Sequence, residues 1–233
     1  MISRLSARTG FLARICAAIF ILFVAQAACA AELGFYVAGF YGEAMREPAD
    51  KAQFDALATD IYAQFGFTPA STVSSLGDDS DTAFGMAGGY RLLPNLALEV
   101  SYMDLGELRY RNDSFGTHID HQEPWRQKLD LKLKGFTLSA LGVLPLSYRW
   151  EAYARAGVLF ASNELNLHIT DFFSARDAEA SSSSTELLAG LGATFSFAEV
   201  YGARFEYQRI FDAGDGLAEN DVDVVSIGFM VSF

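Results

Sequence analysis

Hydrophobic residues alternate with small or polar residues along most of the chain. The C-terminal segment shows the pattern clearly, with hydrophobic side chains at Val225, Ile227, Phe229, Val231 and Phe233. The same two-residue period recurs over 96–103, 187–197 and 201–208. Successive side chains of a strand point to opposite faces of a sheet, so this period predicts β-strands. Twenty Gly, twenty Phe and ten Tyr agree with that reading, because glycine opposes helices and aromatic residues favour strands.

The face opposite the hydrophobic one decides which kind of β-protein is expected. It is mostly Gly, Ser and Ala with a few isolated charges, whereas a soluble sandwich would carry Lys, Glu and Thr there. Small residues suit the crowded lumen of a narrow barrel whose hydrophobic face meets lipid. Aromatic residues also gather near the expected strand ends, as interfacial girdles would: Phe35, Tyr90, Tyr102, Trp150, Phe197, Tyr201 and Phe233. We therefore predict an all-β fold, an eight-stranded antiparallel transmembrane up-and-down β-barrel; a soluble secreted β-protein is the alternative.

Connection lengths support this count of strands. The expected strands cover 33–42, 82–92, 95–105, 128–144, 149–161, 185–197, 200–210 and 222–233. Short links at 93–95, 145–148 and 198–199 then alternate with long polar loops at 43–81, 106–127, 162–184 and 211–221. Short turns on one side and long loops on the other are typical of outer-membrane barrels, with both termini in the periplasm.

The first long loop is expected to contain a helix. Pro48 suits a first helical turn, and the hydrophobic residues that follow are spaced to form one stripe, at Phe54, Leu57, Ile61 and Phe65. The run Ser181–Ser184 is expected to be a flexible loop.

The fourth expected strand changes its pattern near Gly135. Odd positions are hydrophobic before this glycine (Leu129, Leu131 and Leu133), whereas even positions are hydrophobic after it (Phe136, Leu138 and Ala140). A β-bulge near Gly135 would explain the change of parity. Alternatively, residues 128–134 project above the membrane as part of a hairpin.

The first thirty residues have the pattern of a secretory signal peptide. Arg4, Arg8 and Arg14 precede the apolar stretch 15–25, and Ala28-Cys29-Ala30 resembles a cleavage site. Residues 1–30 are therefore expected to be cleaved, leaving an outer-membrane β-barrel domain over 31–233. Both cysteines, Cys16 and Cys29, would leave with the signal peptide.

Charge excludes nucleic acid as a partner. The chain has 17 Lys and Arg against 29 Asp and Glu, a net charge of −12. Without the three arginines of the signal peptide, 14 basic residues remain and the net charge is −15. A nucleic-acid-binding domain carries a basic patch instead.

Several short motifs resemble the transmembrane domain of OmpA-type outer-membrane proteins. They occur in the family's order, at Phe35–Gly42, Gly88–Tyr90 followed by Pro94-Asn95, Leu98–Tyr102, Tyr153–Gly157 and Ala203–Gln208. The resemblance implies a Gram-negative outer-membrane protein that contacts lipopolysaccharide. It also implies that Phe233, with Val231 and Phe229, is the signal read by the barrel-assembly machinery. Two departures are noted: the family's frequent C-terminal peptidoglycan-binding domain is not expected here, and its lumenal lysine of the fourth strand falls near Leu141.

Four charged residues are expected to face the lumen: Glu99, Arg155, Arg204 and Glu206. Buried charges must be paired, because desolvation of an unpaired charge is costly. We predict a salt-bridge network that closes the interior and fixes the packing of the strands. A switchable gate for small ions is the alternative.

Other polar groups predict less. His118, Asp120, His121 and Glu123 have the residue types of a divalent-metal site, but a solvated loop is favoured. Asp78, Asp79 and Asp81 are expected at a hydrated loop end, with bridging of lipopolysaccharide phosphates through Ca²⁺ or Mg²⁺ as the alternative.

No catalytic motif is found. In eight-stranded lipid A deacylases a His-x-Ser pair lies on the outer wall, whereas His168 is followed by Ile169-Thr170. No enzyme, cofactor or metal is therefore expected. The predicted role is structural, in envelope integrity and in surface interactions through long acidic extracellular loops. A narrow porin-like channel and an outer-membrane lipid-modifying enzyme remain alternatives.

Overall fold

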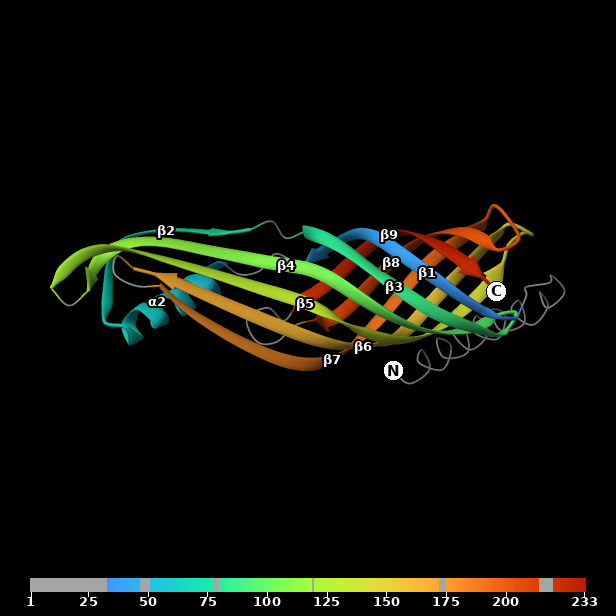
Figure 1. The fold of residues 1–233 in the computed structure, drawn as a ribbon, viewed down its shortest axis with the longest axis horizontal. Coiled ribbons are helices and arrows are strands. Elements are labelled where there is room, and N and C mark those ends of the chain that lie inside the picture. The colour runs from blue at the N-terminus through green and yellow to red at the C-terminus, as the bar shows by residue number, and fades with distance from the viewer. Residues whose placement is uncertain (1–32, 47–50, 78–79, 119, 172–174, 214–219) are drawn as a thin grey trace, which may run out of the picture.

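The computed structural model describes residues 33–46, 51–77, 80–118, 120–171, 175–213 and 220–233. The expected signal peptide, Pro48, Asp78 and Asp79 lie outside these residues. The described elements, in chain order, are β1 (Phe35–Arg46), α2 (Lys51–Gln64), β2 (Phe67–Leu76), β3 (Ser80–Leu93), β4 (Leu96–His118), β5 (His121–Pro145), β6 (Trp150–Thr170), β7 (Ala175–Ser196), β8 (Tyr201–Ala213) and β9 (Asn220–Ser232) (Figure 1).

Eight of these strands close into an antiparallel ring, as predicted. The hydrogen-bonded order is β4-β3-β1-β9-β8-β7-β6-β5, and pairing of β4 with β5 closes the circle. The short links lie where the sequence places them, between β3 and β4, β5 and β6, and β7 and β8. At the same end of the barrel, the amide of Phe233 donates to the carbonyl of Phe35 at 2.9 Å. A ninth strand, β2, lies outside the ring and pairs only with the far half of β4, over Tyr110–His118.

Within the barrel, hydrophobic side chains point outward and small or polar side chains point inward. Leu98 and Val100 of β4 are exposed, whereas Glu99 and Ser101 between them are buried. Aromatic pairs surround the end that carries the short links: Phe35–Tyr90, Trp150–Phe195 and Tyr201–Phe229. At the opposite end, Tyr102 contacts Phe136, next to the first outward charges on these strands, Asp104 and Lys134. This is the arrangement of a barrel that faces lipid.

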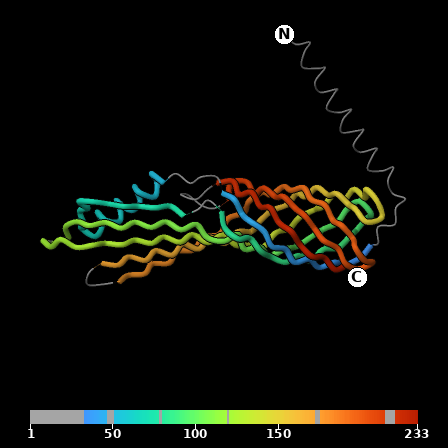
Figure 2. Tube along the Cα trace, turned by 90° about the horizontal axis from the view of Figure 1, so that it is seen from above, coloured from blue at the N-terminus to red at the C-terminus, as the bar shows by residue number. Residues whose placement is uncertain are grey.

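Strands β4 to β7 continue well past the barrel on one side (Figures 1 and 2). The expected loops at 106–127 and 162–184 are therefore wrong, because both segments are mostly strand. Ser181–Ser184 belongs to β7 and pairs with Ala161–Glu164 of β6, so it is not a flexible loop. Part of the polarity that suggested loops comes from outward side chains, and part comes from buried polar side chains at Asn112, Ser114, Glu123 and Gln127.

The change of parity near Gly135 has a different cause from a bulge in that strand. Odd-numbered side chains of β5 point inward on both sides of Gly135, and its register with β6 is continuous. A bulge of β5 near Gly135 is therefore wrong, and residues 128–134 belong to a hairpin of β4 and β5 that extends beyond the ring, as the alternative interpretation predicts. The parity of the strand is constant, but its surroundings change: above the lipid, water is outside and the hydrophobic leucines turn inward.

A bulge does occur at this level, on the neighbouring strand. Leu105 and Gly106 of β4 face the single residue Leu133 of β5, because Asp104 pairs with Lys134 and Glu107 with Lys132. Gly106 has a φ of 75°, a conformation that glycine adopts without strain.

The helix α2 fills the inner face of the projecting sheet. Phe54 and Ala58 are buried in one cluster with Leu108, Tyr110 and Leu129. Tyr62 lies in a second cluster, together with Phe67, Trp125 and Ile169. The predicted helix is thus present; Leu57 and Ile61 are half-buried, but Phe65 lies beyond its end and is exposed. We call α2, β2 and the described parts of 107–133 and 162–184 the distal module.

The helix α2 has 14 residues, and the described residues include no helix with the length and hydropathy of a membrane span.

Candidate functional site

Four charged side chains meet in the centre of the barrel. Glu99 comes from β4, Arg155 from β6, and Arg204 and Glu206 from β8. Each lies at an inward position of its strand, and their exposed fractions are only 1%, 5%, 5% and 8% in that order. The pleat of the three strands therefore brings together all four residues that the sequence placed in the lumen.

The four charges alternate in sign around a closed circuit. Glu99 Oε1 accepts from Arg155 Nη2, and Glu99 Oε2 accepts from Arg204 Nη1 at 2.7 Å. Glu206 completes the circuit, with 2.7 Å from its Oε1 to Arg155 Nε and 3.0 Å from its Oε2 to Arg204 Nη2. Two carboxylates and two guanidinium groups balance each other, which keeps the net charge of the cluster at zero.

Two tyrosines that the sequence analysis did not single out complete the network. Tyr36 OH donates to Glu99 Oε2 at 2.9 Å. Tyr153 OH donates to Glu206 Oε2 at 2.9 Å and accepts from Arg204 Nε at 2.6 Å, while the Arg204 guanidinium lies 4.6 Å from the Tyr153 ring centre. In the sequence, the sign that these two tyrosines face the lumen is their position among the small residues on the inward face of their strands.

The lumen is packed on the side of the network that leads to the distal module. An apolar layer crosses the barrel there, formed by Ala44, Ala83, Met103, Leu105, Leu133, Leu159, Ala161, Leu188, Ile210, Ala213, Val222 and Val224. The void beside the four charges has a volume of about 10 Å³, which is about the space of one water molecule. Side chains of the described residues therefore occupy the space that an open channel would need.

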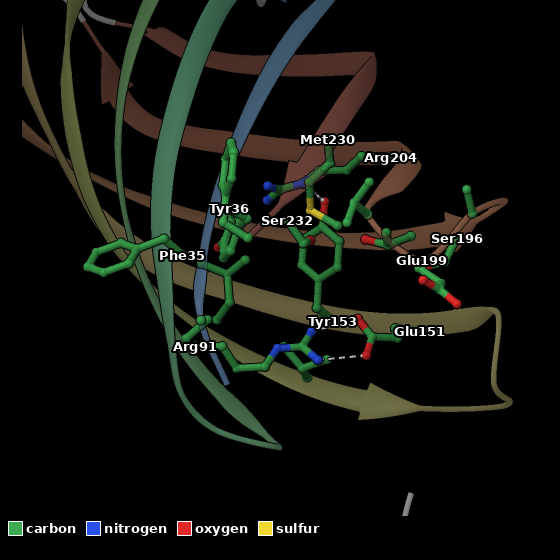
Figure 3. Close-up of a pocket in the computed structure, with 18 of the residues that line it drawn as sticks. Phe35, Tyr36, Arg91, Glu151, Tyr153, Ser196, Glu199, Arg204, Met230 and Ser232 are labelled. Carbon is green, nitrogen blue, oxygen red and sulfur yellow. Dashed lines mark hydrogen bonds and ion pairs between the residues drawn. The ribbon is translucent and has the colours of Figure 1, made fainter. Parts of the chain in front are cut away.

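On the other side of the network, a cavity of about 430 Å³ opens at the end with the short links. Tyr36, Tyr153 and Arg204 lie at its inner wall (Figure 3). Arg91 and Glu151 face each other near the mouth in a bidentate pair, at 2.8 and 2.6 Å, which the sequence analysis missed. The barrel thus has a polar vestibule that ends at the charge network.

Leu141 also lies inside the barrel. It is buried in a cluster with Tyr36, Ala97, Val143 and Tyr153, next to the vestibule. At the position where the resemblance led us to expect a lumenal lysine, this chain therefore has a hydrophobic contact.

The residues of the expected insertion signal lie along the last strand. Phe229 points outward and packs against Tyr201 and Phe197. Val231 pairs with Val37 of β1, and Phe233 is exposed at the barrel rim.

The remaining polar candidates make local contacts. Glu123 accepts from Trp125 Nε1 at 2.9 Å and lies 2.8 Å from His118 Nδ1, and the described residues hold no group of three His, Cys, Asp or Glu suited to a metal. Asp81 accepts from the amides of Thr82 and Glu107, at 2.7 and 2.8 Å, so it holds the bulge in place.

His168 has contacts that the sequence analysis also missed. Its Nδ1 contacts Asp177 across the β6–β7 pair, and its Nε2 lies 3.0 Å from Thr170 Oγ1. Acid, imidazole and hydroxyl follow the order of a hydrolytic triad. The imidazole and carboxylate side chains are 42% and 74% exposed, however, so water screens the charge that would activate the hydroxyl. The contacts are those of a polar sheet surface.

An eight-stranded ring with lipid-facing hydrophobic residues and paired lumenal charges defines a transmembrane β-barrel. The chain matches the family described as the OmpA-like transmembrane domain over residues 35–233, and it belongs to this family. It is accordingly an outer-membrane β-barrel.

Solved structures similar to this chain include those of three bacterial proteins. Ail, the attachment invasion locus protein of Yersinia pestis, in complex with the heparin analogue sucrose octasulfate, is 14% identical over 87% of this chain and 99% of its own, with a TM-score of 0.46. Neisserial surface protein A is 16% identical over 86% and 97%, with a TM-score of 0.45. The N-terminal barrel of Pseudomonas aeruginosa OprF is 13% identical over 87% and 100%, with a TM-score of 0.43. Among curated proteins, none matches the chain.

Proposed function

We propose that this protein is a non-conducting outer-membrane barrel that anchors a folded module on the cell surface, where the module contacts lipopolysaccharide and surface partners. The observation that carries the proposal is the contrast between the two halves of the molecule. The lumen is filled by the charge network and the apolar layer. The projecting strands, by contrast, build a sheet with its own helix and core.

The closed lumen argues against the channel alternative. A solute passing from the vestibule would have to separate four buried, mutually paired charges and then displace the apolar layer. Breaking a buried pair by removing one partner costs about 3–5 kcal/mol. At that cost the state with a broken pair is populated about 1% of the time or less, before displacement of the apolar layer is added.

The distal module supports an interaction role. A rigid sheet covered by a helix presents fixed side chains, so a partner that binds it orders few groups on this side. Strands β4 to β7 are continuous from the lipid-facing wall into this sheet, which holds the module in a defined position above the membrane. Contact with the assembly machinery through Phe233, Val231 and Phe229, and export by residues 1–30, belong to the same proposal.

Planar-bilayer recording tests the closed lumen. The purified protein should give no conductance steps above those of the bare lipid. Glu99→Ala serves as the positive control. It leaves two arginines with one carboxylate, so this variant should conduct more readily than the wild type. Regular steps from the wild-type protein would overturn the non-conducting assignment and favour the channel.

Replacing residues 47–79 with a short Gly-Ser linker tests the role of the module. The barrel should still fold and show heat-dependent mobility on gels, because α2 and β2 are not part of the ring. Cells carrying this variant should lose adhesion to surfaces while their sensitivity to detergents stays unchanged. Unchanged adhesion together with a leaky envelope would instead support a purely structural role.

A further inference from the structure

We infer that the outer face of the distal module binds an anionic saccharide of the surrounding outer-leaflet glycolipid, with Arg111 and Lys128 as the anion-binding pair. The inference rests on the proposed outer-membrane location and names the chemical group that the module would contact there.

Cations are concentrated on this face in an otherwise acidic chain. Six of the 14 basic residues that follow the signal peptide point outward from β4 and β5 above the lipid boundary: Arg109, Arg111, Arg126, Lys128, Lys132 and Lys134. The segment 106–127, expected as an acidic loop, thus contributes three arginines to one sheet face. Four acids share this face (Asp104, Glu107, Asp113 and Asp130), so it has a net charge of +2. A face with an excess of cations on a protein of net charge −15 points to a negatively charged partner.

Most of these cations already have acidic partners. Arg126 pairs with Asp113 at 2.6 Å, and Lys134 pairs with Glu164 at 2.6 Å. Glu107 contacts Arg109 and lies 3.5 Å from Lys132. Asp130, the remaining acid of this face on β5, lies opposite Arg109 in the register.

Arg111 and Lys128 are the exceptions. They are direct cross-strand partners, so their side chains leave the same face of the sheet about 5 Å apart at the backbone. Within the described part of the chain, neither has an ion pair or hydrogen bond. Like charges directly opposite each other destabilise a sheet. An anion between them would remove the repulsion and bring two donors to one group.

The height of the pair above the lipid indicates which anion it meets. Lys134 marks the lipid boundary on β5, and Lys128 lies six residues further along, about 20 Å away at the rise of a strand. Phospholipid headgroups and the innermost glycolipid phosphates lie near the boundary instead. Because the sheet continues the barrel wall, its outer face looks sideways, toward the saccharide layer of neighbouring glycolipids.

An apolar platform lies next to the cations. Phe115 and Pro124 are opposite each other on the same outward face, four residue pairs beyond Arg111 and Lys128, with the Asp113–Arg126 pair between them. They line a hollow of about 510 Å³ together with Arg126, Thr170 and the acids Asp113 and Asp171. Aromatic and apolar surfaces beside hydrogen-bonding groups suit a sugar ring. The face therefore offers a contact for each part of an acidic saccharide: the cation pair for its charged group and the apolar platform for its sugar ring.

Binding of purified lipopolysaccharide to the whole protein in detergent tests the inference. The double variant Arg111→Gln/Lys128→Gln should weaken binding at least tenfold, because the loss of even one charge-assisted contact has about that effect and this variant loses two. Arg149→Gln, which removes a cation at the opposite end of the barrel, is the matched control and should bind like the wild type. Equal binding by the double variant would overturn the inference.

Two further arms identify the bound group. The wild-type protein should bind lipopolysaccharide without its core phosphates as weakly as the double variant binds intact lipopolysaccharide. If removal of the phosphates leaves binding by the wild type unchanged, the role of the anion is overturned. Inorganic phosphate alone should bind at least tenfold more weakly than the glycolipid, and equal affinity would overturn the role of the saccharide.

A charge reversal separates binding from folding. Lys128→Glu places an acid opposite Arg111, so it should raise the resistance of the module to urea while it weakens binding of the glycolipid. A variant that is both less stable and weaker in binding would mean that the pair serves structure. Conductance and adhesion are independent readouts, so failure here is distinguishable from failure of the proposed function.

Discussion

Each charged side chain in the lumen depends on the others, because none has water as an alternative partner. Glu99, for example, receives hydrogen bonds from Arg155, Arg204 and Tyr36. Transfer of charges out of water is expensive, so the complete network adds little net stability, whereas an incomplete one is strongly unfavourable. The sequence could predict these four residues because inward parity and charge together mark them. Tyr36 and Tyr153 have the same inward parity, but aromatic residues lie on both faces of these strands, so parity alone does not mark them as partners of the charges. The Arg91–Glu151 pair joins strands distant in the sequence, which alternation does not encode.

Replacing one lumenal acid should therefore destabilise the barrel far more than replacing an exposed acid. Glu99→Gln leaves Arg155 and Arg204 to share Glu206, and we expect a loss of about 3–5 kcal/mol in the free energy of unfolding. Glu43→Gln, which changes an exposed acid on the outward face of β1, should lose almost nothing. Urea unfolding in the same lipid, followed by gel mobility, compares the two. Equal midpoints would mean that the network does not stabilise the fold.

The bulge glycine should tolerate substitution poorly. A Cβ at Gly106 would lie 2.5 Å from Oδ2 of Asp81, and the backbone at this position has a positive φ that alanine adopts only with strain. Gly106→Ala should therefore lower the free energy of unfolding by about 1–2 kcal/mol. Gly88→Ala is the control, because a Cβ there meets no heavy atom within 4 Å. Unfolding midpoints in urea should fall for the first variant and stay constant for the second. A reversed order would contradict this account of the bulge.

At the scale of the element, β5 shows why the sequence predicted the barrel better than the projecting part. Its lipid-facing half follows the expected rule, with Phe136 and Leu138 outside. In the other half Leu129 and Leu133 are inside, because water replaces lipid around the strand. A local pattern records which face is hydrophobic but not which solvent lies outside. Pairing of β2 with β4 and docking of α2 are long-range contacts, which alternation does not encode.

The helix should be required for the distal module but not for the barrel. Phe54 is fully buried against Leu108, Tyr110 and Leu129, so Phe54→Ala should destabilise the module by about 3–5 kcal/mol. Gln53→Ala, an exposed change on the same helix, is the control. Limited proteolysis should cut the first variant within the module while the barrel keeps its heat-dependent mobility. Loss of the barrel as well would show that the two parts fold as one unit.

Asp55 should make the stability of the module depend on acid pH. Partial burial alone would raise the pKa of this carboxyl, but hydrogen bonds from Lys51 and Tyr110, each at 2.7 Å, hold it below its usual range. A lowered pKa contributes stability above the unfolded value of about 3.9, and this contribution disappears as the pH falls through the folded value. Asp55→Asn should thus be less stable than the wild type at pH 6, with the difference vanishing toward pH 2. Trp125 fluorescence in a Trp150→Phe background measures this.

At the scale of the whole molecule, two cores of opposite construction share the same strands. The barrel has a hydrophobic exterior and an interior that holds the charge network, closed by an apolar layer, while the distal module has a hydrophobic interior and a charged exterior. The boundary between the two regimes passes through Asp104, Lys134 and Asp223, the first outward charges on their strands. Where a residue stands relative to this boundary decides what its outward side chain must be.

The same added charge should therefore have different effects on the two sides of the boundary. Leu138→Lys places a cation on the lipid face of β5, and we expect a loss of about 2–4 kcal/mol and a smaller folded fraction in lipid vesicles. Gln122→Lys adds the same charge to the exposed hairpin end of that strand and should fold normally. Gel mobility without heating measures the folded fraction. Similar yields from both variants would contradict the placement of the boundary.

The continuous parity of β5 also limits how the projecting hairpin can change in length. Removal of two residues from each of β4 and β5 would shorten its reach and leave every remaining side chain on its present side. Removal of a single residue would turn Leu129 toward water and Lys128 toward the helix, because neighbouring positions on a strand face opposite ways. The height of this surface above the membrane can thus change only by an even number of residues per strand, in evolution as in engineering.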